Sequence, residues 1–409
     1  MKAKIHGLLD SILQSNLWFV FLFLDHPWGR RHFFNKYISY RPDFFQRYYK
    51  WKPVFGNPKK IIILKNDAIG DYLLFRNFLE EISNEYRPKG YEIHLIGNII
   101  WKELALNLDG KFVDQFFWLN RGGLNTRPSL QSRLHLLMEV NQNTYSIVLY
   151  PNISREWNGG DWLIKHIPGQ RKVGYNGDVQ NQTESEHQEG NLIFNELIKP
   201  KTGVWFEFFR NREIVEILLG RKSEMISPHI SFEDQDQPEG KYAVLFPGAS
   251  TEAKQWPANH FSEIGKWLNE TMDLRIILAG GHGDISLCEQ IQQTIPGYSE
   301  NLAGETSLVE LLLLIRNATV LISNDTVALH MGIQSGVPSV CPFKCNHYGR
   351  FLPYPEKEFP NLRICIPQQY KILTQRELED KFSQNYGADI TGVVLEDVKK
   401  AILELVNPN

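Results

Sequence analysis

The chain has 409 residues, of which 42% are hydrophobic and 22% are charged, and its formal net charge is −3. This length favours two domains of ordinary size, and so small a net charge gives no overall signal for a nucleic-acid or anionic-membrane partner. Four cysteines are too few for a disulfide framework, which suits a reducing cytosol. The charge is nevertheless uneven. Residues 1–60 carry 11 Lys and Arg, three Asp and no Glu, a net charge of +8, which leaves −11 for the remainder.

Residues 1–58 are predicted to form a basic, aromatic N-terminal extension. Its apolar run Leu17–Leu24 has eight residues, whereas a helix needs about 20 to span a bilayer. Aromatic residues then alternate with Lys and Arg up to Phe55, a mixture that suits a lipid headgroup layer. We expect a soluble, cytoplasmic protein. Two alternatives stay open for residues 1–55: peripheral contact with the inner face of the cytoplasmic membrane, or packing on the protein's own surface.

From Lys59 onward, short β-rich runs alternate with longer helical patterns. The run Ile61–Leu64 predicts a strand buried on both faces, and Leu73–Ile82 has helical periodicity. The alternation is interrupted between about Gly174 and Pro238. The pattern predicts an α/β protein with two facing, doubly wound parallel-sheet domains at 59–235 and 236–409, and a cleft at the carboxyl ends of the strands. Further strands are predicted at 92–96, 146–150, 242–246, 275–278 and 320–322, and further helices at 209–219 and 395–405.

The loop after the first predicted strand contains two carboxylates. It runs Asn66-Asp67-Ala68-Ile69-Gly70-Asp71, and Asp71 lies at or beside a helix N-terminus, where the helix dipole stabilises an anion. Gly70 permits a tight turn or the close approach of a ligand. A carboxylate in this position can accept a proton from a hydroxyl group, although ordinary helix capping is the alternative. The spacing does not decide between Asp67 and Asp71.

Two later loops that follow predicted strands are rich in small residues. Gly248-Ala249-Ser250-Thr251 can bring N–H groups and hydroxyls close to a phosphate, and Lys254 adds positive charge. Gly280-Gly281-His282-Gly283-Asp284 lets a base or ribose lie against backbone, with Asp284 bonded to ribose hydroxyls. Ordinary strand–helix connections are the alternative for both. Neither loop has the Walker or the G-x-G-x-x-G pattern, so a P-loop ATPase and a dehydrogenase are not supported.

A fourth loop, Ser323-Asn324-Asp325-Thr326, joins a strand to a helix. Thr326 and the N–H groups of Val327 and Ala328 would form an anion site at the helix N-terminus. His330 follows one turn later and can face the same ligand. The alternative is a helix cap followed by a histidine of the hydrophobic core. All four loops follow predicted strands, which favours a phosphate-bearing ligand in the second domain.

The cysteines also raise the question of a zinc site. Cys341, Cys345, His347 and Cys365 are the ligand types that zinc prefers. A C-x3-C spacing without a second compact ligand pair is a weak signal, however, and small buried cysteines are common. We therefore expect no metal site.

The order of these motifs resembles glycosyltransferase family 9, the ADP-heptose lipopolysaccharide heptosyltransferases. Ile61–Asp71 resembles that family's opening strand and Ile-Gly-Asp turn. Pro247-Gly248-Ala249 and Lys254–Pro257 are similar to its Pro-Gly-Ala and Lys-Arg-Trp-Pro pattern. Asn301–Leu308 and Ser323–His330 resemble its Leu-Ala-Gly-x-Thr-Ser-Leu and Asn-Asp-(Ser/Thr)-Gly-x-x-His signatures. The resemblance covers the chain from about Lys60 onward.

The resemblance implies a GT-B fold whose N-terminal domain binds the acceptor and whose C-terminal domain binds the nucleotide donor. It makes Asp71 the general base and Lys254 the cation that neutralises the donor phosphate. Two departures leave the donor open: Val327 replaces a usual Gly, and Cys341–Lys344 replaces a Gly-Pro-Thr turn. The remaining predicted site residues are Ser250, Thr251, Gly280, Gly281, Asp284, Asp325, Thr326, Val327 and His330 on the donor side, and Asn66, Asp67 and Gly70 on the acceptor side.

The implied function is inverting, metal-independent transfer of a heptose-like sugar from a nucleotide-diphosphate donor, with an ADP-sugar favoured. The acceptor would be a glycan or glycolipid of the cell envelope, and no cofactor and no nucleic-acid partner are expected. Two alternatives stay open. The first alternative is a catalytically silent family member that binds a nucleotide or glycan. The second is another GT-B enzyme, such as a nucleotide-sugar 2-epimerase or a transferase with a UDP donor.

Overall fold

The computed structural model describes residues 58–121, 128–231, 241–295, 297–383 and 386–406. The predicted extension and its membrane contact thus lie outside the described residues, apart from Pro58. By its internal contacts the chain forms two compact units. Of the described residues, the first unit holds 58–68 and those within Ile82–Lys102 and Lys111–Pro200, and the second holds Ile69–Glu81, Glu103–Gly110 and those from Lys201 onward.

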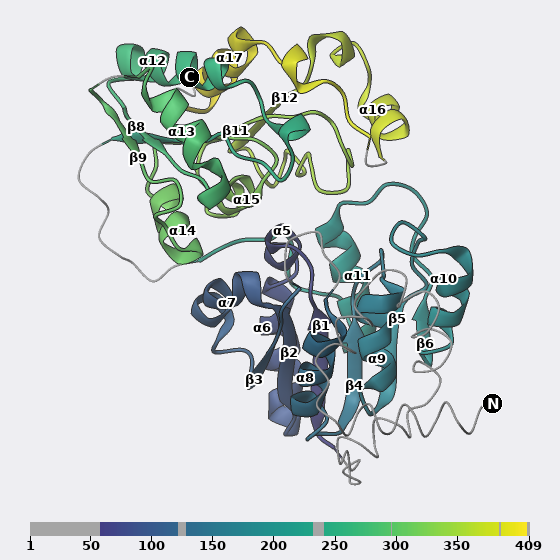
Figure 1. Cartoon of the computed structure of the whole chain (residues 1–409). Helices are drawn as coiled ribbons and strands as arrows, with labels where there is room; N and C mark the ends of the chain where they lie inside the picture. The colour runs from purple at the N-terminus through teal and green to yellow at the C-terminus, as the bar shows by residue number, and fades with distance from the viewer. Residues whose placement is uncertain (1–57, 122–127, 232–240, 296, 384–385, 407–409) are drawn as a thin grey trace, which may run out of the picture. The chain divides into compact units, whose positions relative to one another are not determined.

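The first unit contains a six-stranded sheet in the order β3-β2-β1-β4-β5-β6, in which all neighbouring strands are parallel (Figure 1). Its central strand β1 is buried along Ile61–Lys65, as expected for a strand with helices on both faces. The strands predicted at 61–64, 92–96 and 146–150 are confirmed. The strands are β1 (Lys60–Lys65), β2 (Glu92–Asn98), β3 (Gln115–Leu119), β4 (Tyr145–Tyr150), β5 (Gly169–Tyr175) and β6 (Glu196–Ile198).

The second unit contains another six-stranded parallel sheet, in the order β12-β11-β10-β7-β8-β9 (Figure 1). Counted from its own first strand, β7, this sheet has the same strand order as the first sheet. The prediction of two doubly wound parallel sheets is confirmed. The strands are β7 (Tyr242–Phe246), β8 (Arg275–Leu278), β9 (Ser299–Asn301), β10 (Val320–Ser323), β11 (Ser339–Pro342) and β12 (Leu362–Cys365).

Helices connect most of the strands. The helices predicted at 209–219 and 395–405 are confirmed as α11 and α17. Over the residues that the structure describes, every helix is too short or too polar to cross a membrane. The α-helices are α5 (Ile69–Leu73), α6 (Asn77–Tyr86), α7 (Lys102–Asp109), α8 (Leu130–Val140), α9 (Trp162–His166), α10 (Glu184–Asn191), α11 (Glu207–Leu219), α12 (Ala258–Met272), α13 (Ile285–Gln292), α14 (Leu308–Arg316), α15 (Val327–Gln334), α16 (Gln375–Phe382) and α17 (Leu395–Val406).

The prediction of one helix over 73–82 is wrong in part, because a turn separates α5 from α6. The carbonyl oxygen of Leu74 accepts a hydrogen bond from Asn211 Nδ2 at 3.2 Å. The N–H of Phe78 instead donates to the carbonyl of Phe75 at 3.0 Å. A tertiary hydrogen bond therefore replaces one helical bond, which the local periodicity could not reveal.

The predicted interruption after Gly174 starts too early. Strand β5 continues to Tyr175, and α10 and β6 extend the α/β alternation to Ile198. Helix α10 is polar, so it gives little hydrophobic periodicity. Its N-terminus does carry a capping box, in which Thr183 and Glu186 bond to each other's backbone N–H groups, and this T-x-x-E spacing was a readable signal.

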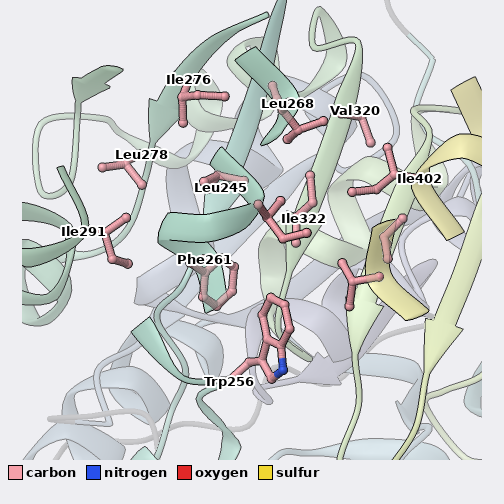
Figure 2. Packing of buried hydrophobic residues seen from close by; sticks show 14 of the residues in the cluster. Leu245, Trp256, Phe261, Leu268, Ile276, Leu278, Ile291, Val320, Ile322 and Ile402 are labelled. Carbon is pink, nitrogen blue, oxygen red and sulfur yellow. The ribbon is translucent and has the colours of Figure 1, made fainter. Parts of the chain in front are cut away.

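A hydrophobic core underlies the second sheet. Figure 2 shows strand side chains, among them those of Leu245 and Ile322, packed against Phe261 and Leu268 of α12. Trp256 closes one end of this core, and its ring N–H donates to the carbonyl of Val393 at 2.9 Å. Full burial of so large a side chain fixes the loop that carries it, which also contains Lys254.

Candidate functional site

A buried asparagine joins two loops at the carboxyl end of the second sheet. Asn324, directly after β10, is fully buried. Its Nδ2 donates to the carbonyl of Pro247 at 2.7 Å, and its Oδ1 accepts the N–H of Trp256 at 3.1 Å. Strands β7 and β10 are neighbours in the sheet. The loop after β7 is therefore fixed at both of its ends by one side chain.

This arrangement brings Lys254 and Asp325 together. Lys254 ends the short helix η5 (Glu252–Lys254), and its Nζ lies 3.3 Å from Asp325 Oδ2. Both side chains are mostly but not fully buried, at 23% and 15% exposed. A partly desolvated ammonium is a stronger attractor for an anion than a solvated one. Two residues that were predicted on the donor side, Lys254 and Asp325, thus form an ion pair.

Helix α15 begins beside this pair. Its N-cap residue is Thr326, whose hydroxyl does not cap the helix but lies 3.0 Å from the hydroxyl of Ser323. The first-turn N–H groups, including that of Val327, have no acceptor four residues earlier in the helix. They carry the positive end of the helix dipole, so an anion near Lys254 would also be attracted by this terminus.

His330 is buried in the first turns of α15. Its Nδ1 lies 2.8 Å from the hydroxyl of Tyr354, which also accepts a hydrogen bond from Gln334 Nε2 at 3.0 Å. With the tyrosine hydroxyl as the donor to Nδ1, the neutral ring would carry its proton on Nε2. Burial lowers the pKa of His330, Asp325 opposes this effect, and Lys254 adds to it. We assign His330 as a neutral imidazole.

Gly70 packs against this histidine. A Cβ atom at position 70 would lie 3.0 Å from the imidazole Cδ2 and 3.1 Å from Nε2 of His330. The position therefore favours glycine, because a larger side chain would displace the ring. Both residues belong to the second unit, so the unit that contains Lys254 and Asp325 also contains helix α5.

Asp71 lies in the first turn of α5 and is half-buried. The segment around it is held by buried polar contacts: the hydroxyl of Tyr72 bonds to Asp109, and Arg76 forms an ion pair with the same carboxylate at 2.8 Å. Arg76 also donates to the carbonyl of His229 at 2.9 Å. These bonds fix the start of α5, which presents the predicted general base.

The glycine-rich loop after β8 closes on itself. Asp284, in the short helix η6 (His282–Asp284), accepts the N–H of Gly281 at 2.9 Å. Its carboxylate lies so close that a Cβ on Gly248 would meet it at 2.3 Å, and a Cβ on Gly280 would meet Asp284 Cβ at 2.7 Å. These contacts give Asp284 a structural role at the junction of two predicted donor loops. Ser250 and Thr251 lie exposed on the first of them.

Asp67 is occupied within the first unit. One carboxylate oxygen lies 2.7 Å from Nζ of the buried Lys65, and the other accepts Asn152 Nδ2 at 2.5 Å. Asn66 beside it is buried at 1% exposed, and its carboxamide has no hydrogen-bond partner in the described part of the chain. Of the two carboxylates that the sequence left open, Asp67 is held in a local network within the first unit.

Three side chains of the site were not predicted. Asn324 lies inside the loop Ser323-Asn324-Asp325-Thr326, and its position directly after a predicted strand could have marked it as a site residue. Asn346 donates from Nδ2 to Asp325 Oδ2 at 3.4 Å, and Tyr354 holds His330. Both come from the long connection after β11, where no local pattern marks them.

The cysteines are all free and buried. Burial raises the pKa of Cys345 to about 12, and that of Cys365 also to about 12, so these groups are thiols at neutral pH. Among the described residues, no three His, Cys, Asp or Glu side chains gather in an arrangement that could hold a metal ion.

Comparisons with known proteins point to one family. Residues 222–375 match the model of glycosyltransferase family 9 (heptosyltransferase). The resemblance to this family is confirmed. The matched segment contains Lys254, Asp325, His330 and Asn346. Lipooligosaccharide heptosyltransferase 2 of Haemophilus influenzae is 31% identical over 116 residues, which are 27% of this chain and 33% of that relative. The enzyme of the same name from Haemophilus ducreyi is 32% identical over 97 residues, or 22% and 28% of the two chains. The alignments thus span about a third of these relatives' length.

Solved structures of the family share the fold. The glycosyl transferase family 9 protein of Veillonella parvula superposes with a TM-score of 0.66 at 16% identity, over 87% of this chain and all of that one. The E. coli heptosyltransferase WaaC, solved with ADP-2-deoxy-2-fluoro heptose, gives 0.61 at 17% identity over 84% of this chain and 99% of its own. The two-sheet architecture is therefore that of family 9 glycosyltransferases.

Proposed function

We propose that this protein is a glycosyltransferase that moves a heptose-like sugar from a nucleotide-diphosphate donor, with an ADP-sugar favoured, to a glycan or glycolipid of the cell envelope. One observation carries this proposal above the others. The Lys254–Asp325 pair lies beside the N-terminus of α15, inside the segment that matches family 9. An ammonium group and a helix N-terminus together suit a diphosphate leaving group.

In the proposed reaction, an acceptor hydroxyl attacks the anomeric carbon of the donor from the face opposite the diphosphate. The bond between that carbon and the diphosphate oxygen breaks, and the leaving oxygen keeps the electron pair. Asp71 takes the proton from the attacking hydroxyl. Lys254 and the amides at the start of α15 stabilise the negative charge that develops on the leaving diphosphate. The configuration of the sugar is inverted.

Asp71→Asn tests the base. The substitution preserves the size of the side chain but removes its basicity, so turnover should fall by about 10²-fold or more with donor binding nearly unchanged. Nucleotide release and donor affinity are measured on the full chain. Asp67→Asn is the matched control, because its carboxylate is bound by Lys65 and Asn152; it should lower stability and leave turnover per folded molecule close to the parent. An Asp71→Asn variant as active as the parent would remove Asp71 from the mechanism.

The donor and the metal requirement are tested in the same assay. The wild-type protein is incubated with ADP- and UDP-sugars, with and without EDTA. Because Lys254 and the helix terminus are proposed to neutralise the diphosphate, turnover with the preferred donor should not change on chelation. Loss of activity in EDTA that returns with a divalent ion would contradict that part of the proposal.

A further inference from the structure

The connection that follows β11 reaches the charged pair of the second sheet. Strand β11 is the neighbour of β10, so the loops after both strands leave the same edge. Asn346 lies in the loop after β11, and its Nδ2 approaches Asp325 Oδ2, the same oxygen that faces Lys254. Asn346 therefore touches the group that we assign to the leaving diphosphate.

The backbone around Asn346 has an unusual conformation. Cys345 and His347, on either side, have positive φ angles of 67° and 51°. Residues other than glycine rarely adopt this conformation, and it persists only where surrounding contacts enforce it. Here the loop is held by backbone hydrogen bonds to neighbouring segments: the N–H of Phe343 donates to the carbonyl of Cys365, and the N–H of Tyr348 donates to the carbonyl of Phe382. The fold thus holds one asparagine in a fixed position.

The orientation of the Asn346 carboxamide is set by charge. Only its NH₂ group can donate to the carboxylate of Asp325, so Oδ1 must point away from it. The residue is 3% exposed, and Oδ1 is buried without a hydrogen-bond partner among the residues that the structure describes. A buried carbonyl oxygen without a donor is unfavourable, so Oδ1 keeps an acceptor position that a donor group of a ligand can fill.

The chemistry of Oδ1 restricts that ligand group. A diphosphate offers only acceptor oxygens and cannot bond to an amide oxygen, whereas a hydroxyl can donate to it. We propose that Asn346 is a specificity-determining residue of the donor site, whose Oδ1 accepts a hydrogen bond from a hydroxyl of the nucleotide sugar next to the diphosphate. This inference rests on the proposed function. The hydroxyl belongs either to the transferred sugar or to the ribose, and both sources share this chemistry.

The test measures binding of ADP-heptose and of ADP by titration calorimetry. Asn346→Ala should weaken ADP-heptose binding by about 10-fold or more, because a buried hydrogen bond is lost. Unchanged ADP affinity assigns the hydroxyl to the transferred sugar, and an equal loss for ADP assigns it to the ribose. Asn346→Ser, which keeps a small polar side chain, is measured beside it in case the alanine variant folds poorly.

A double-mutant cycle separates this role from a merely structural one. Donor analogues that each lack one hydroxyl are bound to wild type and to Asn346→Ala. For one analogue, the affinity of the wild type should be about 10-fold lower than for the complete donor. The variant should bind that analogue and the complete donor with equal affinity. Asn361→Ala is the matched control, since the side-chain Nδ2 of this asparagine donates to the carbonyls of Ile333 and Val337, before β12. This variant should show the same discrimination as wild type.

The outcomes also distinguish the two proposals. The role of Asn346 would be overturned if wild type and Asn346→Ala lost affinity equally for every deoxy analogue, or if both Asn346 variants bound the donor as tightly as wild type. This holds even if the wild type transfers sugar. A wild type that binds ADP-heptose with the predicted coupling but releases no nucleotide would overturn the transferase and leave the donor contact standing. If the wild type binds no nucleotide sugar, both proposals fail.

Discussion

The two sheets have the same strand order, yet their carboxyl ends carry different chemistry. In each, an asparagine after the fourth strand reaches the loop after the first strand. In the first sheet, Asn152 bonds to both members of the Lys65–Asp67 ion pair. In the second sheet, Asn324 bonds to backbone groups of Pro247 and Trp256. The same bridge therefore connects a charged pair in one sheet and main chain in the other.

This difference has a chemical consequence. Lys65 is 1% exposed, and its ammonium is enclosed by Asp67 and Asn152, so its charge is neutralised inside the protein. In the second sheet Asn324 satisfies main-chain groups instead, and the next residue, Asp325, pairs with Lys254, whose side chain is 23% exposed. A common architecture thus produces an ion pair with a fully buried lysine in one unit and an ion pair with a partly exposed lysine in the other.

The largest expected contrast comes from removing each lysine. Lys254→Ala should lower kcat/KM by about 10² to 10³, because one group that stabilises transition-state charge is lost, with little change in the free energy of unfolding. Lys65→Ala should instead lower the free energy of unfolding by about 3 kcal/mol, because Asp67 and Asn152 lose their buried partner. Denaturant titration and donor kinetics on both variants would check this. Similar kinetic losses in the two variants would contradict the comparison.

The two asparagines give a smaller contrast. Asn324→Ala leaves the buried N–H of Trp256 and the carbonyl of Pro247 without their partner, which should cost about 1–3 kcal/mol of stability. It should also raise KM for the donor, since the Lys254 loop loses its anchor. Asn152→Ala leaves the Lys65–Asp67 pair in place and should cost about 1.5–3 kcal/mol, because the lost bonds are to charged groups, with unchanged KM. Urea unfolding and initial rates measure both effects, and an unchanged KM in Asn324→Ala would show that the loop keeps its position without the bridge.

The smallest effect concerns pH and a second buried pair of the first unit. Arg155 Nε lies 3.7 Å from Asp161 Oδ1, and both side chains are fully buried. Burial raises the pKa of Asp161 to about 6, although Arg155 opposes this. A carboxyl whose pKa is raised on folding contributes stability that is fully present below its unfolded pKa of 3.8 and is lost as the pH rises through about 6.

Asp161→Asn removes this titration. As the pH rises from 5 to 7.5, the Tm of the variant should therefore increase relative to that of the wild type by roughly 5 °C. Thermal unfolding at the two pH values measures it, and Asp178→Asn, a partly exposed carboxylate of the same unit, is the control. A difference that is the same at both pH values would show that Asp161 does not titrate in this range.

Much of the architecture follows from local patterns. The apolar runs of β1 and β7 predict buried parallel strands, and the loops with Lys254 and Asp325 meet because β7 and β10 are adjacent. The sequence could not show that Asp67 would be neutralised by Lys65, because this depends on Asn152 from another strand. Asn346 and Tyr354 were missed for the same reason. Their partners Asp325 and His330 lie 21 and 24 residues away, and no spacing rule links such positions.

The grouping of Ile69–Glu81 and Glu103–Gly110 with the second unit bears on protein engineering. A truncated gene that starts at Lys201 would keep Phe208 but lack its stacked partner Phe78 on α6. It would also keep His229 but lack the Arg76 side chain that binds its carbonyl. Such a fragment would expose apolar surface and unmatched backbone groups. Independent production of the second unit would therefore require these two short segments to be grafted back or supplied in trans.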